Sequence, residues 1–178
     1  MRKYLIITLA ALTVCAGCTR KTRHFGTEGA GMQASCTYNG TDSTHAQWQF
    51  TNEDGSPLVA EYDSLRVIEL GPEGHPATVC FHQGTRQLWF QFYSNMQKRS
   101  EGCMENGLRE GMWTFYYPDG TKQTEYAFVG GKEEGRYKVF RENGFPYYIG
   151  QCHEGRRVGT WEVYDANGNL VTTKDYGD

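Results

Sequence analysis

The sequence predicts an all-β protein built as an elongated antiparallel sheet of stacked β-hairpins. The first observation is a 24-residue period between Gly107 and Tyr176, in which three copies of one pattern follow each other. The second is a composition of 14% aromatic residues with 22 Gly in 178 residues, which suits strands and tight turns better than helices. A fixed period of this size indicates supersecondary units that stack on their neighbours.

The three copies keep one register over residues 111–120, 135–144 and 159–168. Each begins at a Gly, places an aromatic residue two positions later and places a second Gly seven residues after that aromatic. The aromatic positions are Trp113, Tyr137 and Trp161, and the second Gly positions are Gly120, Gly144 and Gly168.

One period reads as a single hairpin. We expect a strand over 112–117, a turn at Pro118-Asp119-Gly120 in which Gly120 takes a positive φ, and a second strand over 121–128. Residues 130–135 then turn the chain into the next copy. Because a lone hairpin cannot bury its aromatic side chains, neighbouring copies must pack side by side.

Alternation along each strand assigns the aromatic side chains to two faces. The set expected to form the core is Trp113, Phe115, Tyr117, Tyr137, Val139, Trp161 and Val163. Tyr116, Phe140 and Tyr164 recur on the other face. Together with Tyr147 and Tyr148 they are our candidate binding surface, because exposed Tyr side chains anchor protein interfaces. The alternative is that they form a second layer of core.

The pattern continues in weaker form upstream, over 46–106. Trp89 lies one period before Trp113, with Met96 at the turn position that Gly holds elsewhere. Trp48 and Val67 have the same spacing to Gly55 and Gly74, so they are further candidate anchors. Chance is the alternative for these two, since many hairpins have an aromatic residue before a Gly turn.

The motif Gly-x-x-x-Gly-x-Trp-x-x-Tyr-x-x-x-Gly resembles the MORN repeat, and in particular the variant repeats of bacterial antitoxin-like proteins. Its clearest copy here is Gly107, Gly111, Trp113, Tyr116 and Gly120. The resemblance covers 107–176 and departs from the motif at Tyr137 and Phe140, which keep an aromatic ring. It implies an elongated curved sheet that binds protein or, in some relatives, lipid. Fold alone does not settle function.

The first 17 residues are expected to be a lipoprotein signal peptide. Arg2 and Lys3 precede an apolar run over 4–14, which is too short for a membrane-spanning helix. The run ends in Cys15-Ala16-Gly17-Cys18, which resembles the bacterial lipobox except that Cys15 replaces an aliphatic residue. Cys18 is then the lipidated first residue of the mature chain, held in the membrane by acyl chains. Ordinary signal cleavage and an uncleaved anchor are the alternatives.

Residues 18–45 are rich in Gly, Ser and Thr without a period, so we expect a flexible tether. Its basic residues 20–23 lack the acidic character that marks some surface-exported lipoproteins, which favours an envelope location facing the periplasm over the cell surface. Without the leader the chain has 16 basic and 21 acidic residues, a net charge of −5. That balance gives no reason to expect nucleic-acid binding.

Four further cysteines are candidates for two disulfides, because an even number of cysteines in an oxidising compartment favours pairing. They are Cys36, Cys80, Cys103 and Cys152. Cys103 and Cys152 lie about two periods apart, roughly 19 Å in a regular stack of strands. A disulfide needs Cα atoms within roughly 7 Å, so this pair is disfavoured.

No catalytic, metal or cofactor motif stands out, and we expect no enzyme activity. The five His residues form no paired ligand spacing, and no nucleophile elbow or phosphate loop is present. Lys132, Arg156 and Arg157 are expected in equivalent turns between hairpins, with Arg109 beside them. These side chains form either a solvated edge or a basic rim for an acidic partner or lipid head groups.

Two function classes remain open. One is a membrane-anchored protein-interaction module, including an antitoxin or immunity-type lipoprotein with an unidentified protein partner. The other is a structural envelope scaffold or lipid-contacting protein.

Overall fold

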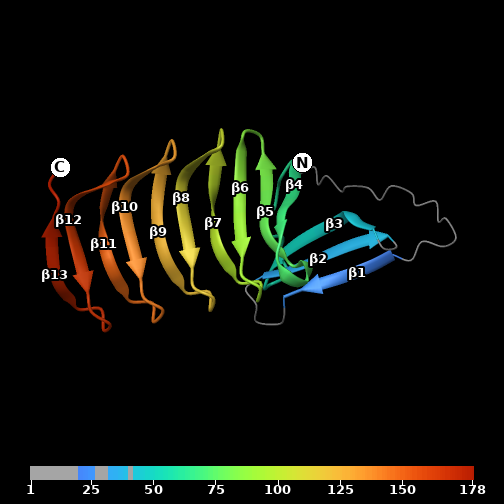
Figure 1. Ribbon diagram of the computed structural model, residues 1–178, viewed down its shortest axis with the longest axis horizontal. Coiled ribbons are helices and arrows are strands. Elements are labelled where there is room, and N and C mark those ends of the chain that lie inside the picture. The colour runs from blue at the N-terminus through green and yellow to red at the C-terminus, as the bar shows by residue number, and fades with distance from the viewer. Residues whose placement is uncertain (1–19, 27–31, 40–41) are drawn as a thin grey trace, which may run out of the picture.

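The chain forms two antiparallel sheets, shown in Figure 1. The computed structural model describes residues 20–26, 32–39 and 42–178. A three-stranded sheet contains β1 (Arg20–Phe25), β2 (Met32–Asn39) and β3 (Asp42–Asn52). A ten-stranded sheet contains β4 (Ser64–Leu70), β5 (Pro76–Gln83), β6 (Arg86–Phe92), β7 (Lys98–Glu105), β8 (Leu108–Tyr116), β9 (Lys122–Val129), β10 (Lys132–Phe140), β11 (Pro146–His153), β12 (Arg156–Tyr164) and β13 (Leu170–Asp175).

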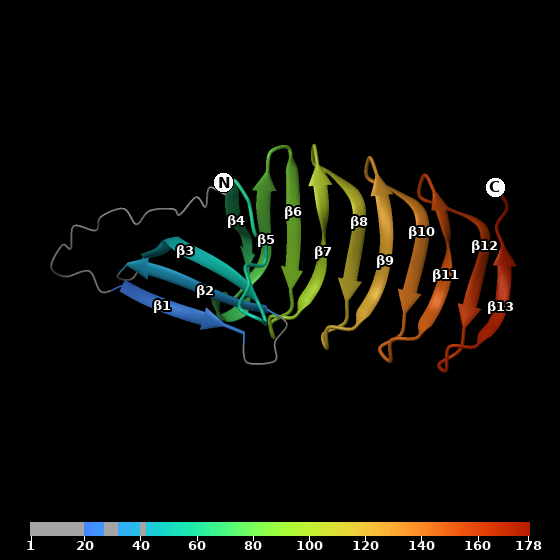
Figure 2. The same cartoon turned by 180° about the vertical axis from the view of Figure 1, so that it is seen from behind.

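The ten-stranded sheet is a meander in which each strand pairs with the next one along the chain. The predicted fold class, an elongated antiparallel sheet of consecutive hairpins, is therefore confirmed. Strands β7–β13 form a single layer, and no other element of the described chain lies over either of their faces in the two opposite views of Figures 1 and 2.

All six predicted anchors precede the same turn. In each copy, the residue four positions after the anchor donates its backbone N–H to the carbonyl of the residue eight positions after the anchor, at 2.8–2.9 Å. The residue seven positions after the anchor closes the turn at 2.9–3.2 Å and has a positive φ between 64° and 88°. The pattern holds for Trp48, Val67, Trp89, Trp113, Tyr137 and Trp161. The two weakest anchors are thus true equivalents, although Trp48 belongs to the smaller sheet.

The connections between hairpins are shorter than the sequence suggested. Two residues with positive φ turn the chain at Asn106-Gly107, Gly130-Gly131 and Glu154-Gly155, which is the type I′ geometry of tight hairpins. The prediction of a turn over 130–135 is wrong beyond Gly131. Lys132 already begins β10, and Gly135 lies inside that strand at a bulge, with a φ of 76°.

The smaller sheet packs on one side of the end of the long sheet that holds β4–β6. Figures 1 and 2 show its strands running across those of the long sheet. Buried apolar side chains from β2, β3, β5 and β6 form the core between the sheets, namely Met32, Ala34, Phe50, Val79, Phe81, Phe90 and Phe92. The expectation of a flexible tether over 18–45 is therefore wrong for Arg20–Phe25, for Met32–Asn39 and for residues 42–45, which begin β3. Alternate residues of β2 supply apolar side chains to this core, which outweighs the polar composition.

Met96 joins the two sheets. It occupies the turn position that is Gly in the other five copies. Its φ of 64° lies in the left-handed region, which is strained for a residue with a side chain. Its side chain is 1% exposed and belongs to the core between the sheets. Burial of the thioether chain therefore offsets the strained backbone.

The prediction of disulfides among Cys36, Cys80, Cys103 and Cys152 is not met in the structure. All four are buried free thiols. Cys80 lies on β5 and Cys103 on β7, with β6 between them, so their Cα atoms are about 9–10 Å apart by strand spacing. Cys152 is four strands beyond β7, and Cys36 lies in the other sheet.

The proposed lipidation site Cys18 and the signal peptide lie outside the described residues. Among the residues that the structure describes, no helix has the length and apolar character needed to span a bilayer.

Candidate interaction surface

One face of β8–β13 carries a continuous series of aromatic rings, which we call the aromatic face. Neighbouring rings lie 4.6–6.3 Å apart between centroids. Its members are Trp113, Phe115, Tyr126, Phe128, Tyr137, Trp161 and Tyr176. Trp113, Phe128 and Trp161 are buried, whereas Tyr126 and Tyr137 are half-buried. The predicted core aromatics Trp113, Tyr137 and Trp161 thus lie on one face, as expected.

The two tryptophans are held in the same way. The Trp113 indole N–H donates to the carbonyl of Cys103 at 3.0 Å, and the Trp161 indole N–H donates to that of Gln151 at 3.1 Å. Each ring lies directly over a glycine of the preceding strand, Gly102 or Gly150. A Cβ added to either glycine would lie 2.2 Å from the ring. In the middle copy Tyr126 replaces this glycine and stacks on Tyr137, at 4.6 Å.

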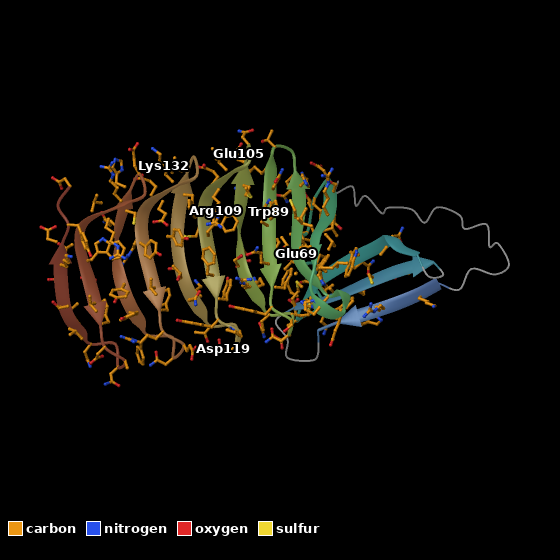
Figure 3. All side chains as sticks on the ribbon, viewed as in Figure 1. Glu69, Trp89, Glu105, Arg109, Asp119 and Lys132 are labelled. Atoms are coloured by element: carbon orange, nitrogen blue, oxygen red, sulfur yellow. The ribbon has the colours of Figure 1, made fainter. Side chains whose placement is uncertain are left out.

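An arginine covers each tryptophan on the aromatic face. The guanidinium carbon of Arg109 lies 4.5 Å from the centre of the Trp113 ring, and that of Arg157 lies 4.5 Å from the Trp161 ring. The sequence predicted Arg157 in a turn and Arg109 beside one. They lie instead inside β8 and β12, in line with their own tryptophans. Figure 3 shows Arg109 set back along β8, whereas Lys132 and Glu105 lie at the rim.

Glu133 occupies the corresponding position in the middle copy. It pairs across the ladder with Phe128 of the aromatic face, and it lies next to Cys152, which is itself opposite Arg157. Burial, with the nearby Glu133 carboxylate, raises the pKa of the Cys152 thiol to about 11. Burial is also the main reason that the pKa of Tyr137 rises to about 12. Both groups are therefore neutral at physiological pH.

The opposite face of the same strands carries ion pairs, and we call it the ionic face. Glu125 accepts hydrogen bonds from Lys138 at 2.6 Å and Lys122 at 2.9 Å. Glu101 accepts from Lys98 at 3.0 Å and from the Tyr116 hydroxyl. Burial and this carboxylate raise the pKa of Tyr116. The polar groups of this face are therefore largely paired with each other.

The structure divides the predicted binding residues between the two faces. Tyr116, Phe140 and Tyr164 lie on the ionic face, all half-buried, with the Tyr164 hydroxyl donating to Glu162 at 2.7 Å. Tyr148 lies on the aromatic face, because it pairs with Val139 and Val163. Tyr147 occupies the bulge beside it, and the two rings are 3.9 Å apart. The five residues therefore do not form one surface.

Glu133, and the packing of the two arginines on tryptophan rings, were not predicted from the sequence. The signal was present, since Arg109, Glu133 and Arg157 are one period apart. The prediction put these charges in or beside turns, where charged side chains are usually solvated.

A cleft of about 750 Å³ opens where β1 meets the turns at 72–75 and 94–96. Arg23 crosses it, stacks on Phe25 and donates to the carbonyl of Glu73 at 2.8 Å. His75, also on its wall, is bonded to the carbonyl of Pro72 at 2.6 Å. These contacts hold the cleft walls together, so the cleft is better explained as part of the junction between the sheets.

Within residues 20–26, 32–39 and 42–178, no group of three or more His, Cys, Asp or Glu side chains is placed to hold a metal ion. Comparison of the chain with models of protein families, and with curated proteins, found no match.

Proposed function

We propose that this chain is a membrane-anchored, non-enzymatic interaction module of the bacterial envelope whose aromatic face binds a protein partner. The observation that carries the proposal is an uncovered single-layer sheet with half-buried Tyr and exposed Arg side chains on one face. Tyr and Arg are enriched at the centres of protein interfaces, where they supply most of the binding energy.

The ionic face is a less suitable binding surface, which also favours the aromatic face. Its carboxylates Glu101 and Glu125 are already paired with lysines, so a partner docking there would have to disrupt or desolvate existing ion pairs. On the aromatic face, no carboxylate of the described residues forms an ion pair with Arg109 or Arg157. Anchoring through Cys18, facing the periplasm, fits the leader-like N-terminus and is part of the proposal. Neutralising a toxin in the envelope is one role that such a module would serve.

A second candidate function is a structural scaffold of the envelope. It is favoured by side-chain hydrogen bonds that join successive turns along one rim. Tyr93, Tyr117 and Arg141 each donate to a backbone carbonyl 23 residues further on, at 2.8–2.9 Å. Such repeated links make a stiff rod, which suits a spacer as well as it suits a binding platform.

The test is capture of a partner from bacterial envelope extract by a soluble form spanning residues 19–178. Tyr148→Ala alters the aromatic face, and Tyr164→Ala is the matched change of a half-buried tyrosine on the ionic face. We expect a discrete partner at near-native salt, lost with Tyr148→Ala and kept with Tyr164→Ala.

Capture that survives Tyr148→Ala but not Tyr164→Ala would move the interface to the ionic face. Absence of any discrete partner, together with binding to bare vesicles, would favour the scaffold or lipid-contacting role instead.

A further inference from the structure

Three charged side chains form a row across the aromatic face. Arg109 on β8, Glu133 on β10 and Arg157 on β12 occupy equivalent positions in successive hairpins. Phe128 of β9 lies between the first two, and Cys152 of β11 lies between the last two. Adjacent strands are about 4.8 Å apart, so the row repeats roughly every 9.6 Å and its arginines are about 19 Å apart.

The two arginines are oriented but not neutralised. Both side chains are exposed, and in the described part of the chain no carboxylate forms an ion pair with either one. Arg157 also donates to the Tyr176 hydroxyl at 3.1 Å, which further restrains the position of its guanidinium group. A guanidinium held over an indole ring can still direct N–H groups to a carboxylate, and a lysine lacks this forked set of donors.

We propose that this row binds an extended protein segment with two carboxylates six residues apart and a basic residue midway between them. The inference rests on the proposed function and adds the chemistry of the partner. Each carboxylate would be bound by one guanidinium, and the basic side chain would lie over Glu133. Charge complementarity therefore defines both the signs and the order of the three contacts.

The spacing fits a polyproline II conformation. That helix rises about 3.1 Å per residue with three residues per turn, so every third side chain returns to the same side after about 9.3 Å. The hairpins repeat at about 9.6 Å, so three side chains at successive turns match three hairpins. Proline-rich segments also dock on surfaces lined with aromatic rings, as this face is.

Glu133 argues for a protein segment over a membrane surface. A layer of lipid phosphates would place negative charge against Glu133 as well as against the arginines. The whole chain has a net charge of −3, which gives no general attraction to anionic lipid. A segment with alternating charge meets all three groups favourably.

The test uses the full-length chain purified in detergent and a fluorescent synthetic peptide. The peptide has Glu at its first and seventh positions, Lys at its fourth and Pro elsewhere. Two control peptides are also made of Glu, Lys and Pro. In one, Glu and Lys exchange places throughout. In the other, one Pro is removed on each side of Lys, which shortens the spacing between the charges. We expect the first peptide to bind at least about tenfold more tightly than either control, as charged hydrogen bonds imply.

Variants then assign the contacts. Arg109→Gln and Arg157→Gln should each weaken binding by about tenfold. Because these changes also uncover a tryptophan, thermal melting checks that the fold survives. Glu133→Lys keeps both arginines and should reverse the preference at the fourth position, so that a peptide with Glu there binds more tightly than one with Lys. Loss of folding cannot produce such a reversal.

Equal binding of all three peptides, or an unchanged preference with Glu133→Lys, would overturn the proposal. A second result would also overturn it: the chain binds anionic vesicles made of phosphatidylglycerol but none of the peptides. In that case Arg109→Gln and Arg157→Gln would abolish the vesicle binding. If the envelope partner is captured equally by the wild type and both arginine variants, this inference fails and the interaction module itself stands.

Discussion

At the scale of single residues, the ionic face is governed by Glu125. Its side chain is 15% exposed and lies between Lys138 and Lys122. The hydrogen bond from Lys138 is the largest cause that lowers the pKa of Glu125 below its ordinary value of 4.5. A folded-state pKa below the unfolded value means that the ionised carboxylate stabilises the fold above pH 4.5. This contribution is lost as the pH falls through the folded-state pKa.

We predict that Glu125→Gln lowers the free energy of unfolding by about 1 kcal/mol at neutral pH and by less in acid. The difference from wild type should shrink steadily, because protonation removes the same interaction from the wild type. Urea unfolding between roughly pH 3 and pH 7 measures it. Glu142→Gln changes an exposed turn carboxylate and serves as the control. A difference that stays constant with pH would show that Glu125 acts through packing.

At the scale of elements, each hairpin is defined by how an aromatic ring meets the preceding strand. The first and third copies place Trp113 or Trp161 over a glycine, and the middle copy stacks Tyr137 on Tyr126. Ring size and the facing residue change together, because a bulky side chain at 102 or 150 would overlap the indole. The two solutions fill the same space between strands.

We predict that Gly150→Ala destabilises the protein by about 1–3 kcal/mol through overpacking against Trp161. Gly150 does not have a positive φ, so backbone strain is not the reason. Combining Gly150→Tyr with Trp161→Tyr reproduces the pair of the middle copy and should be more stable than Gly150→Tyr alone. Denaturant unfolding of the variants measures both effects. A neutral Gly150→Ala, or no gain from the second change, would contradict this account.

At the scale of the whole molecule, the smaller sheet is attached to the long sheet at a turn that deviates from the repeat. The residue at this turn position is Met96, and its side chain reaches the core that contains Met32 and Phe50. The position equivalent to it in a later copy is Gly144, which has a φ of 82° and nothing within 4 Å of an added Cβ. Burial is what makes a side chain at this position favourable.

We predict that Met96→Gly destabilises the protein by roughly 1–3 kcal/mol, since the lost burial exceeds the relief of strain. The loss should be concentrated at the junction, so amide exchange in β2 should accelerate more than in β12. Gly144→Met makes the reverse change where no core is available, and strain of about 1–2 kcal/mol should destabilise that variant too. Stabilisation by Met96→Gly would show that its side chain contributes little.

The sequence by itself determined the repeat, the turns that follow Trp113, Tyr137 and Trp161, and the face on which these three rings lie. These follow from local rules, because alternation along a strand and the positive φ of a turn glycine act within a few residues. The alignment of neighbouring strands was decided only in the tertiary structure. Bulges place three residues of β8, 111–113, opposite the single residue Gly102 of β7, and likewise three residues of β12, 159–161, opposite Gly150 of β11.

Those bulges place Arg109 and Arg157 inside strands and over their tryptophans, where the sequence had suggested positions in or beside turns. The cysteines, and the strands Arg20–Phe25 and Met32–Asn39, likewise depend on contacts between distant parts of the chain. Four thiols remained unpaired because β6 separates two of them, and a polar segment became two strands because the end of the long sheet offered a core. Contacts between residues far apart in the chain depend on strand order and burial, which local composition does not encode.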